Sequence, residues 1–470
     1  MTSSHTNVDV VSSLRGVDVM AWLKHAVFAV LGAVVLMSVT VSAQVIDIED
    51  ANITQAVERE LQNDDAVASH LIDIETEDGV VTLSGSVDNL LARERTVRLT
   101  GAIKGVRSIV NLIEVSPVPR TDAQIERDVK QTLQLDPVAD IYEIEPAVRD
   151  GRVVLTGFVD SWPEKKLSED IARSVAGVRG LDNEIVVNRK ADRMDHQIRS
   201  DVRAMLDSDP LVDARHIDVA VHNGDVTLSG AVGSVFEATK AIENARVAGA
   251  RNIDSESLKI QWWLRETMER TTPIEVETNV EIEEAIRDAL DRDPRTNEFG
   301  IEVESANGLV TLTGAVDNLK ARRAAEKDAE NTAGVWKVKN KLKVRPINPP
   351  SDEYIRNAIE NVFQRDGILE KTDITALVRN QKVYLYGTVD TGYEKGRATE
   401  VASGIFGVVA IENNIEATVR LVRKSDAQIK EDLRSELFWD ASIDSDDILV
   451  QVEDGVVTLT GAVDSRQQLK

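Results

Sequence analysis

Apolar side chains recur at every fourth position in a series of segments along the chain. One segment places Ile125, Val129 and Leu133 in this spacing, with charged residues between them. Residues four apart lie on one face of an α-helix, so the pattern predicts an amphipathic helix. The same spacing recurs at Ile282, Ile286, Leu290 and at Ile429, Leu433, Leu437.

A predicted β-hairpin follows each of these helices. Its first strand alternates apolar and polar residues and begins at an isoleucine, such as Ile144. In most copies an Asp-Gly or Asn-Gly turn follows, which is the strongest short signal for a hairpin. One copy has Asn380-Gln381 instead, which predicts a looser or strained turn. A glycine inside the second strand indicates a bulge or a close backbone approach. We expect structural turn or cap roles for Gly79, Gly85, Gly151, Gly157, Gly224, Gly230, Gly308, Gly314, Gly387, Gly455 and Gly461.

An aspartate lies 21 positions before each glycine of the second strand, and we call it the ruler aspartate. The six copies are Asp64, Asp136, Asp209, Asp293, Asp366 and Asp440. A proline follows three of them, at Pro137, Pro210 and Pro294, and proline ends a helix. We therefore expect the ruler aspartate to cap the turn after the first helix, rather than to bind calcium.

Each unit ends with an Ala-rich helical stretch, a second glycine and a short strand. The second glycines are predicted helix C-caps, at Gly105, Gly177, Gly249, Gly334 and Gly407. The order helix, strand, strand, helix, strand predicts an α+β module, with two helices on one face of a three-stranded mixed sheet. The period of about 73 residues identifies a tandem repeat. Modules one to six are expected at residues 50–117, 121–188, 192–261, 276–346, 351–419 and 425–470.

This module resembles the BON domain. The resemblance lies in the hairpin pattern Gly-x-Val-x-Leu-x-Gly-x-Val at 79–87, 224–232 and 455–463, and in the Gly-Val pair before the last strand, as at Gly105-Val106. It covers nearly all of residues 50–470. The resemblance implies attachment to phospholipid or to other envelope components, often under osmotic or envelope stress, with no known catalysis and no catalytic residue to transfer. Five or more modules in tandem depart from the usual one to three copies.

The composition argues against several functional classes. The net charge of −26 opposes binding to phosphate-rich nucleic acid, so no nucleic-acid partner is expected. The chain has no cysteine, which excludes disulfides and Cys-based metal sites. No histidine recurs between modules, and no nucleophile-base pair or phosphate-binding glycine loop is present. We expect no enzyme activity, no cofactor, no metal and no small-molecule substrate.

The first 43 residues have the pattern of an export signal. Arg15 and Lys24 precede the apolar run 26–41, and Val41-Ser42-Ala43 resembles a cleavage site before Gln44. The run is also long enough to remain as an inner-membrane anchor through residues 26–43. Both alternatives place the modules on one side of a membrane, and the cysteine-free composition favours a periplasmic location.

Two features are candidates for membrane contact. Trp262 and Trp263 lie in the enlarged spacer between modules three and four, where they either reach a lipid interface or, as we favour, pack between the two modules. A cationic stripe alternates with apolar residues, and its members are Lys337, Lys339, Lys341, Lys343 and Arg345. The stripe either protects a solvated sheet edge or binds lipid head groups, and the first alternative is favoured. The basic second helix of module one is a weaker candidate of the same kind.

The sequence therefore favours an exported, non-enzymatic envelope protein whose modules bind phospholipid membrane or stabilise the envelope under osmotic stress. The alternative is a periplasmic scaffold or spacer that binds envelope proteins without contacting lipid. Module six stops at the start of its second helix, so we also expect either that the chain is a fragment or that this half-module is loose or borrows a partner.

Overall fold

The computed structural model describes residues 48–136, 143–188, 193–209, 211–261, 278–418, 424–443 and 445–461, with the single positions 138, 263, 463 and 469. All the helices and strands below belong to the compact unit Ile46–Lys470. The export signal and anchor predicted within residues 1–43 lie outside the described residues.

Module two shows the repeated architecture. Helix α3 (Asp122–Leu135) is followed by β5 (Ile144–Arg149), β6 (Arg152–Val159), α4 (Trp162–Arg173), β7 (Gly180–Asn183) and β8 (Val186–Val187). Strand β6 is central, because it pairs antiparallel with β5 and parallel with β7 and β8. Val129 of α3 and Leu155 of β6 are fully buried, so the apolar face predicted for the helix forms the core against the sheet.

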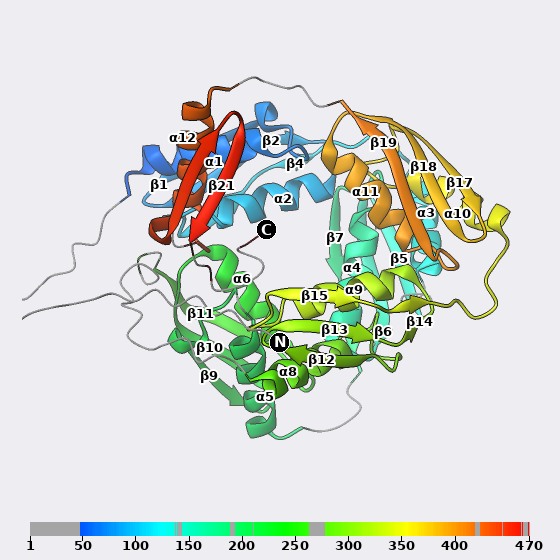
Figure 1. The fold of residues 1–470 in the computed structure, drawn as a ribbon, viewed down its shortest axis with the longest axis horizontal. Coiled ribbons are helices and arrows are strands. Elements are labelled where there is room, and N and C mark those ends of the chain that lie inside the picture. Colours follow the sequence, from blue (N-terminus) through cyan, green and yellow to red (C-terminus); the bar gives the residue numbers. More distant parts are fainter. Residues whose placement is uncertain are drawn as a thin grey trace, which may run out of the picture. The chain divides into compact units, whose positions relative to one another are not determined.

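The other modules repeat this α+β order, and Figure 1 shows the units following one another along the chain. Module one has α1 (Asp50–Asn63), β1 (Ile72–Glu77), β2 (Val80–Val87), α2 (Leu90–Gly101), β3 (Ser108–Asn111) and β4 (Glu114–Val115). Module three has α5 (Asp195–Ser208), β9 (Ile217–His222), β10 (Asp225–Val232), α6 (Val235–Asn244) and β11 (Ile253–Ile260). Module four has α8 (Asn279–Arg292), β12 (Glu302–Ala306), β13 (Leu309–Thr313), β14 (Ala315–Val316), α9 (Leu319–Glu330), β15 (Lys337–Asn340) and β16 (Lys343–Val344).

Module five has α10 (Asp352–Phe363), β17 (Asp373–Arg379), β18 (Lys382–Val389), α11 (Gly392–Ser403) and β19 (Ala410–Ala417). Module six has α12 (Asp426–Trp439), β20 (Ile448–Glu453) and β21 (Val456–Gly461). Short 3₁₀ turns precede the hairpins at η1 (Ser69–Leu71), η3 (Ala214–His216) and η4 (Ser445–Asp447).

Two local predictions need correction. The second glycines are not helix C-caps: α2 ends at Gly101 and α4 at Arg173, whereas Gly105 and Gly177 lie in the following turn with φ of 87° and 90°. The chain makes a further turn there before the last strand. That strand is continuous in modules three and five, but it is broken into two short strands in modules one, two and four.

The ruler aspartate caps the turn after the first helix in every module. Its Oδ1 accepts a hydrogen bond from the backbone N–H two residues later, at Ala66, Val138, Leu211, Arg295, Ile368 and Ser442. This local bond turns the chain out of the helix and satisfies a backbone donor. The six aspartates therefore have a shared structural explanation.

A second recurring carboxylate joins the first helix to the hairpin turn. The Asp122 side chain accepts hydrogen bonds of 2.9 Å from the N–H groups of both Asp150 and Gly151. The equivalent carboxylates in modules one, three, five and six make the same paired contact, from Asp50, Asp195, Asp352 and Asp426. At Asp195 these two backbone bonds are the main reason that the pKa of the carboxyl is lowered.

The glycine inside the second strand lies where the first strand begins. Gly85 has φ of 111°, and a Cβ placed on it would lie 2.1 Å from the carbonyl oxygen of Leu71. Gly157, in module two, has φ of 133° and the same conflict with Glu143. Only glycine combines a positive φ with this close backbone approach.

The hairpin turn of module five contains a non-glycine residue in the left-handed region. Gln381 has φ of 64°, at a position where the other modules have glycine. We expect Gln381→Gly to stabilise this hairpin by about 0.5–1 kcal/mol, because relief of the left-handed penalty outweighs the added flexibility of glycine. Slower hydrogen exchange of the β17 and β18 amides would show the gain. Gly455→Gln is the matched control: a Cβ there meets nothing within 4 Å, so this change imposes the backbone penalty alone.

Candidate functional site

The cationic stripe occupies the last strand of module four. Strand β15 pairs parallel with β13, and β16 pairs parallel with β14, so the stripe lies at one edge of the sheet. Val338, Asn340, Leu342 and Val344 are buried or half-buried, whereas the alternating cationic residues are exposed. The backbone alternation therefore places all five cations on the sheet face opposite the helices.

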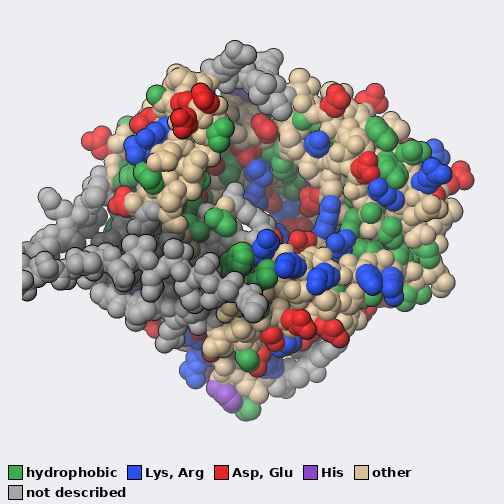
Figure 2. All heavy atoms as spheres, viewed as in Figure 1, with side chains coloured by type: hydrophobic (Ala, Val, Ile, Leu, Met, Phe, Trp, Pro, Cys, Tyr) green, Lys and Arg blue, Asp and Glu red, His purple; other side chains and the backbone are tan. Residues whose placement is uncertain are grey.

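No carboxylate in the described part of the chain lies within ion-pair distance of a stripe residue. The other outer strand, β12, carries the exposed Glu302 and Glu304. The uncharged residues of β13 separate these glutamates from the stripe, since Thr311 pairs with Glu304 on one side and with Lys339 on the other. Figure 2 shows a row of Lys and Arg side chains over the region where Figure 1 places β15, with Asp and Glu side chains below it. The exposed face is thus divided into a cationic and an anionic edge.

Trp336 adjoins the stripe and was not among the residues predicted to contact a membrane. Its side chain is 54% exposed, and its indole Nε1 donates a hydrogen bond of 2.6 Å to the carbonyl oxygen of Asn307. This bond fixes the ring beside the hairpin turn, next to Lys337. The signal for it was present in the sequence as a tryptophan directly before the first lysine of the stripe.

The remaining predicted contact residues have other positions. Trp263 is half-buried, whereas Trp262 lies outside the described residues. The basic segment of module one is partly engaged in contacts. Arg95 forms an ion pair of 2.6 Å with Asp64 and stacks on the ring of Tyr393, and Lys104 is only 4% exposed. Arg98 and Arg107 are exposed, so this segment stays a weaker candidate than the stripe.

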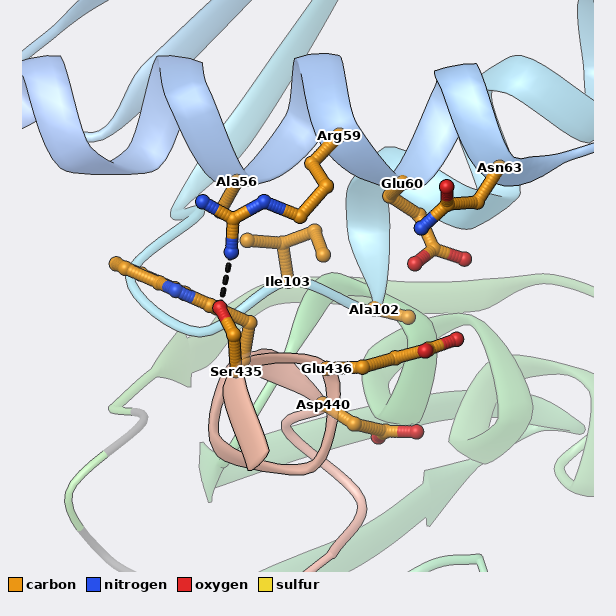
Figure 3. Close-up of a pocket in the computed structure, with 10 residues that line it drawn as sticks. Ala56, Arg59, Glu60, Asn63, Ala102, Ile103, Ser435, Glu436 and Asp440 are labelled. Atoms are coloured by element: carbon orange, nitrogen blue, oxygen red, sulfur yellow. Dashed lines mark hydrogen bonds between the residues drawn. The ribbon is translucent and has the colours of Figure 1, made fainter. Parts of the chain in front are cut away.

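An acidic cleft lies between α1 of module one and α12 of module six. Figure 3 shows Glu60 and Asn63 of α1 facing Glu436 and Asp440, and the cleft is also lined by Arg59 and Trp439. The guanidinium of Arg59 donates a hydrogen bond to Ser435 across the cleft. Burial, followed by the charges of Glu436 and Asp440, raises the pKa of Glu60. The cleft is a contact between modules with excess negative charge.

A second acidic cluster is buried inside module four. Asp293 is paired with Arg295, whose Nε lies 2.9 Å from Oδ1 of the carboxylate. Burial and the neighbouring charge of Asp293 raise the pKa of Asp328 well above its usual range. The Oδ2 atom of Asp328 is buried and has no hydrogen-bond partner among the residues that the structure describes. No group of three or more potential metal ligands occurs among the described residues, so neither acidic cluster is a candidate metal centre.

Among the described helices, none has the length and apolar character needed to cross a bilayer. The exposed cations and Trp336 of module four form the candidate membrane-contact surface among the described residues.

The repeats match a known domain family. A family model for the BON domain matches residues 49–117, 121–189, 194–260, 278–346, 351–418 and 425–470. Osmotically-inducible protein Y of Escherichia coli (strain K12) is 28% identical over 144 residues, covering 29% of this chain and 72% of that protein. Outer membrane lipoprotein DolP of Haemophilus influenzae is 29% identical over 144 residues, covering 30% of this chain and 74% of that protein.

A solved structure also aligns with part of the chain. The C-terminal domain of CdsD, the structural protein of the type III secretion system of Chlamydia trachomatis, is 15% identical, with a TM-score of 0.12. The alignment covers 46% of this chain and 100% of that chain.

Proposed function

Because the chain belongs to the BON domain family, whose model matches most of its length, we propose that it is a non-enzymatic envelope protein that attaches to anionic phospholipid through module four. The relatives named as an osmotically inducible protein and an outer membrane lipoprotein support a place in the cell envelope. The export pattern in residues 1–43 is consistent with a periplasmic location. The observation that carries the proposal is the exposed cationic stripe on the edge strand β15 and the residues after it, which forms no ion pair with a carboxylate of the described residues.

The spacing of the stripe suits a charged surface. Alternate residues on a strand are about 6–7 Å apart, so the cations extend in one direction along the sheet edge. Each Lys or Arg near an anionic leaflet contributes about 1 kcal/mol of attraction. The glutamates of β12 are repelled by the same leaflet, so the charge pattern orients the module with β15 toward the head groups. Trp336 lies beside the stripe, and indole rings partition to the head-group region.

The strongly negative net charge of the chain opposes a general attraction to anionic lipid. A local contact of this kind depends on screening, and the Debye length is about 10 Å at 0.1 M salt. Binding through the stripe is therefore expected to be orientation-specific and salt-sensitive. A protein scaffold that binds envelope proteins is the second candidate function, because attachment through a protein-docking face requires no anionic lipid.

Vesicle flotation tests the proposal. The chain from Gln44 onward is mixed with vesicles of graded anionic lipid content at low and high salt. We expect flotation to rise with anionic lipid, to fall with salt, and to drop to background in the Lys337→Glu, Lys339→Glu, Lys341→Glu variant.

The matched control reverses three exposed cations elsewhere, in the Arg127→Glu, Lys130→Glu, Arg149→Glu variant. Both variants have the same net charge, so only the position of the reversed charges differs. Equal loss of flotation in both variants would contradict a role for the stripe. Absence of flotation by the folded wild-type chain at low salt would leave the scaffold function.

A further inference from the structure

Module six contacts module one through a two-bond backbone bridge. The N–H of Lys104 donates to the carbonyl oxygen of Trp439, and the N–H of Ala441 donates to that of Ala102, both at 2.9 Å. These bonds flank the antiparallel pair Ile103 and Asp440. The bridge thus joins the loop before a second glycine to the ruler aspartate of another module.

The same bridge occurs between modules two and five. Ala176 donates to Arg365 at 2.6 Å and Gly367 donates to Ser174 at 2.8 Å, around the antiparallel pair Val175 and Asp366. Because equivalent backbone atoms are used, the bridge is a property of the module and not of particular side chains.

Modules three and four make one bond of the same bridge. Ala333, directly before Gly334, donates to the carbonyl oxygen of Ser208, directly before Asp209. The residue after Asp209 is a proline, which has no N–H to donate the second bond. Proline after a ruler aspartate therefore limits the bridge to one bond.

We call the residues before the second glycine the joint loop, and the ruler aspartate with its two neighbours the acceptor segment. The joint loop of module five, Ile405–Phe406, makes no bridge within the described residues: the amide of Phe406 donates no backbone hydrogen bond there, and its side chain is half-buried. In the bridged loops the equivalent residues Lys104 and Ala176 are buried, and Ala333 is half-buried. The joint loop of module three, residues 247–248, also makes no bridge within the described residues, but the loop of module five combines an open donor with an apolar ring.

One acceptor segment is also open and able to form both bonds. Asn63 and Asp65 of module one are exposed, and no proline follows Asp64. The acceptor segments of modules two and four precede Pro137 and Pro294, so they cannot donate the second bond. Module one thus carries an unused acceptor segment of the same kind as those of modules five and six, each of which makes both bonds of its bridge.

We propose that the joint loop of module five binds the acceptor segment of module one in a second copy of this chain. The amide of Phe406 donates to the carbonyl oxygen of Asn63, and the N–H of Asp65 donates to the carbonyl oxygen of Gly404. Each copy contributes one loop and one segment, so the contact is heterologous and propagates from head to tail. The occupant is a BON module, because the three bridges within the chain all join one BON module to another.

Cysteine cross-linking of the purified full-length chain tests the contact. The chain has no cysteine of its own, so only introduced residues react. The bridge would place Asp64 opposite Ile405, in the position of the pair Ile103 and Asp440. We expect a mixture of Asp64→Cys and Ile405→Cys chains to give a disulfide-linked heterodimer upon oxidation, whereas neither chain alone gives a dimer.

The variant Asp65→Pro provides the specific control. It removes the donor N–H, while the backbone at Asp64 (φ −86°, ψ 117°) already suits a following proline, as at Asp293 (φ −77°, ψ 116°) before Pro294. We expect Asp65→Pro to abolish the heterodimer and Asp65→Ala to retain it. Sedimentation velocity of chains without cysteine should show concentration-dependent self-association in wild type and Asp65→Ala, but not in Asp65→Pro.

The double variant Ile103→Cys, Asp440→Cys is the positive control for oxidation. These two residues are paired within one chain, so we expect an intramolecular disulfide to form between them. Efficient closure of this pair without any heterodimer would overturn the proposal. Self-association that is equal in Asp65→Pro and Asp65→Ala would also overturn it.

Discussion

Replacement of Arg397 by Met is expected to destabilise module five by about 3–5 kcal/mol. Asp366 is 3% exposed, and Arg397 of α11 holds it through contacts of 2.7 and 3.0 Å. Removing the guanidinium leaves a buried carboxylate without its counter-charge, which is among the most costly single changes in a protein core. Hydrogen exchange of the β17, β18 and β19 amides in the full chain would measure the loss locally.

The double variant Asp366→Asn, Arg397→Met separates the charge effect from lost packing. Asn retains the oxygen that accepts from the N–H groups of Ile368 and Leu369, so the turn is kept while the charge is removed. We expect the double variant to be more stable than Arg397→Met alone. The exposed pair Lys130 and Glu145 is the control, because Lys130→Met should cost no more than about 1 kcal/mol. Equal costs for the single and double variants would exclude the buried charge as the cause.

Replacement of Asp328 by Asn is expected to stabilise module four at neutral pH by about 1–3 kcal/mol. Burial raises the pKa of Asp328, so its stability contribution is fully present below the unfolded-state pKa and is lost as the pH rises through the folded-state value. An amide stays neutral and can donate permanently to Asp293, which removes both the unfavourable charge and this pH dependence.

Hydrogen exchange of module four, corrected for intrinsic exchange rates, provides the measurement. As the pH rises from acidic to neutral, protection of the module-four amides against exchange should fall in the wild type but not in Asp328→Asn. In acid the two proteins should show the same protection. Asp317→Asn is a suitable control, because Asp317 is only half-buried at the start of α9. If Asp328→Asn and wild type show the same pH dependence, Asp328 is not the group that titrates.

Much of the module follows from short-range patterns. The apolar spacing of α3, the Asp-Gly turns and the strand glycines each act through local geometry, so one sequence suffices to place them. The helix C-caps were predicted incorrectly, because the spacing to Gly105 and Gly177 did not distinguish a helix end from the turn that follows it. The break in the last strand has no such local explanation: Asn183 accepts from the N–H of Ile185 at the break between β7 and β8, but Asn413 accepts from the N–H of Ile415 in the same way within the continuous strand β19.

The candidate site was only partly accessible to sequence analysis. Alternation alone places Lys337 and Lys339 on one face of β15, whereas the separation from the glutamates of β12 depends on strand order. Trp336 was overlooked because it was assigned to the strand instead of the surface. The bridges between modules use backbone atoms, so no side-chain pattern in the sequence predicts them. The proline after the ruler aspartate does bear on the bridge, because it removes one donor. From the sequence it was interpreted only as a helix stop.

The three bridges are nested along the chain, since module three contacts module four, module two contacts module five, and module one contacts module six. Domains generally fold as units in the order in which they are synthesised. The central pair is therefore complete when only four modules have emerged, whereas module one must wait for the last segment of the chain. Until then its joint loop is exposed to other chains. The time between the appearance of Ile103 and that of Asp440 is thus a period of vulnerability to wrong pairing during biosynthesis, and it lengthens with every module inserted between them.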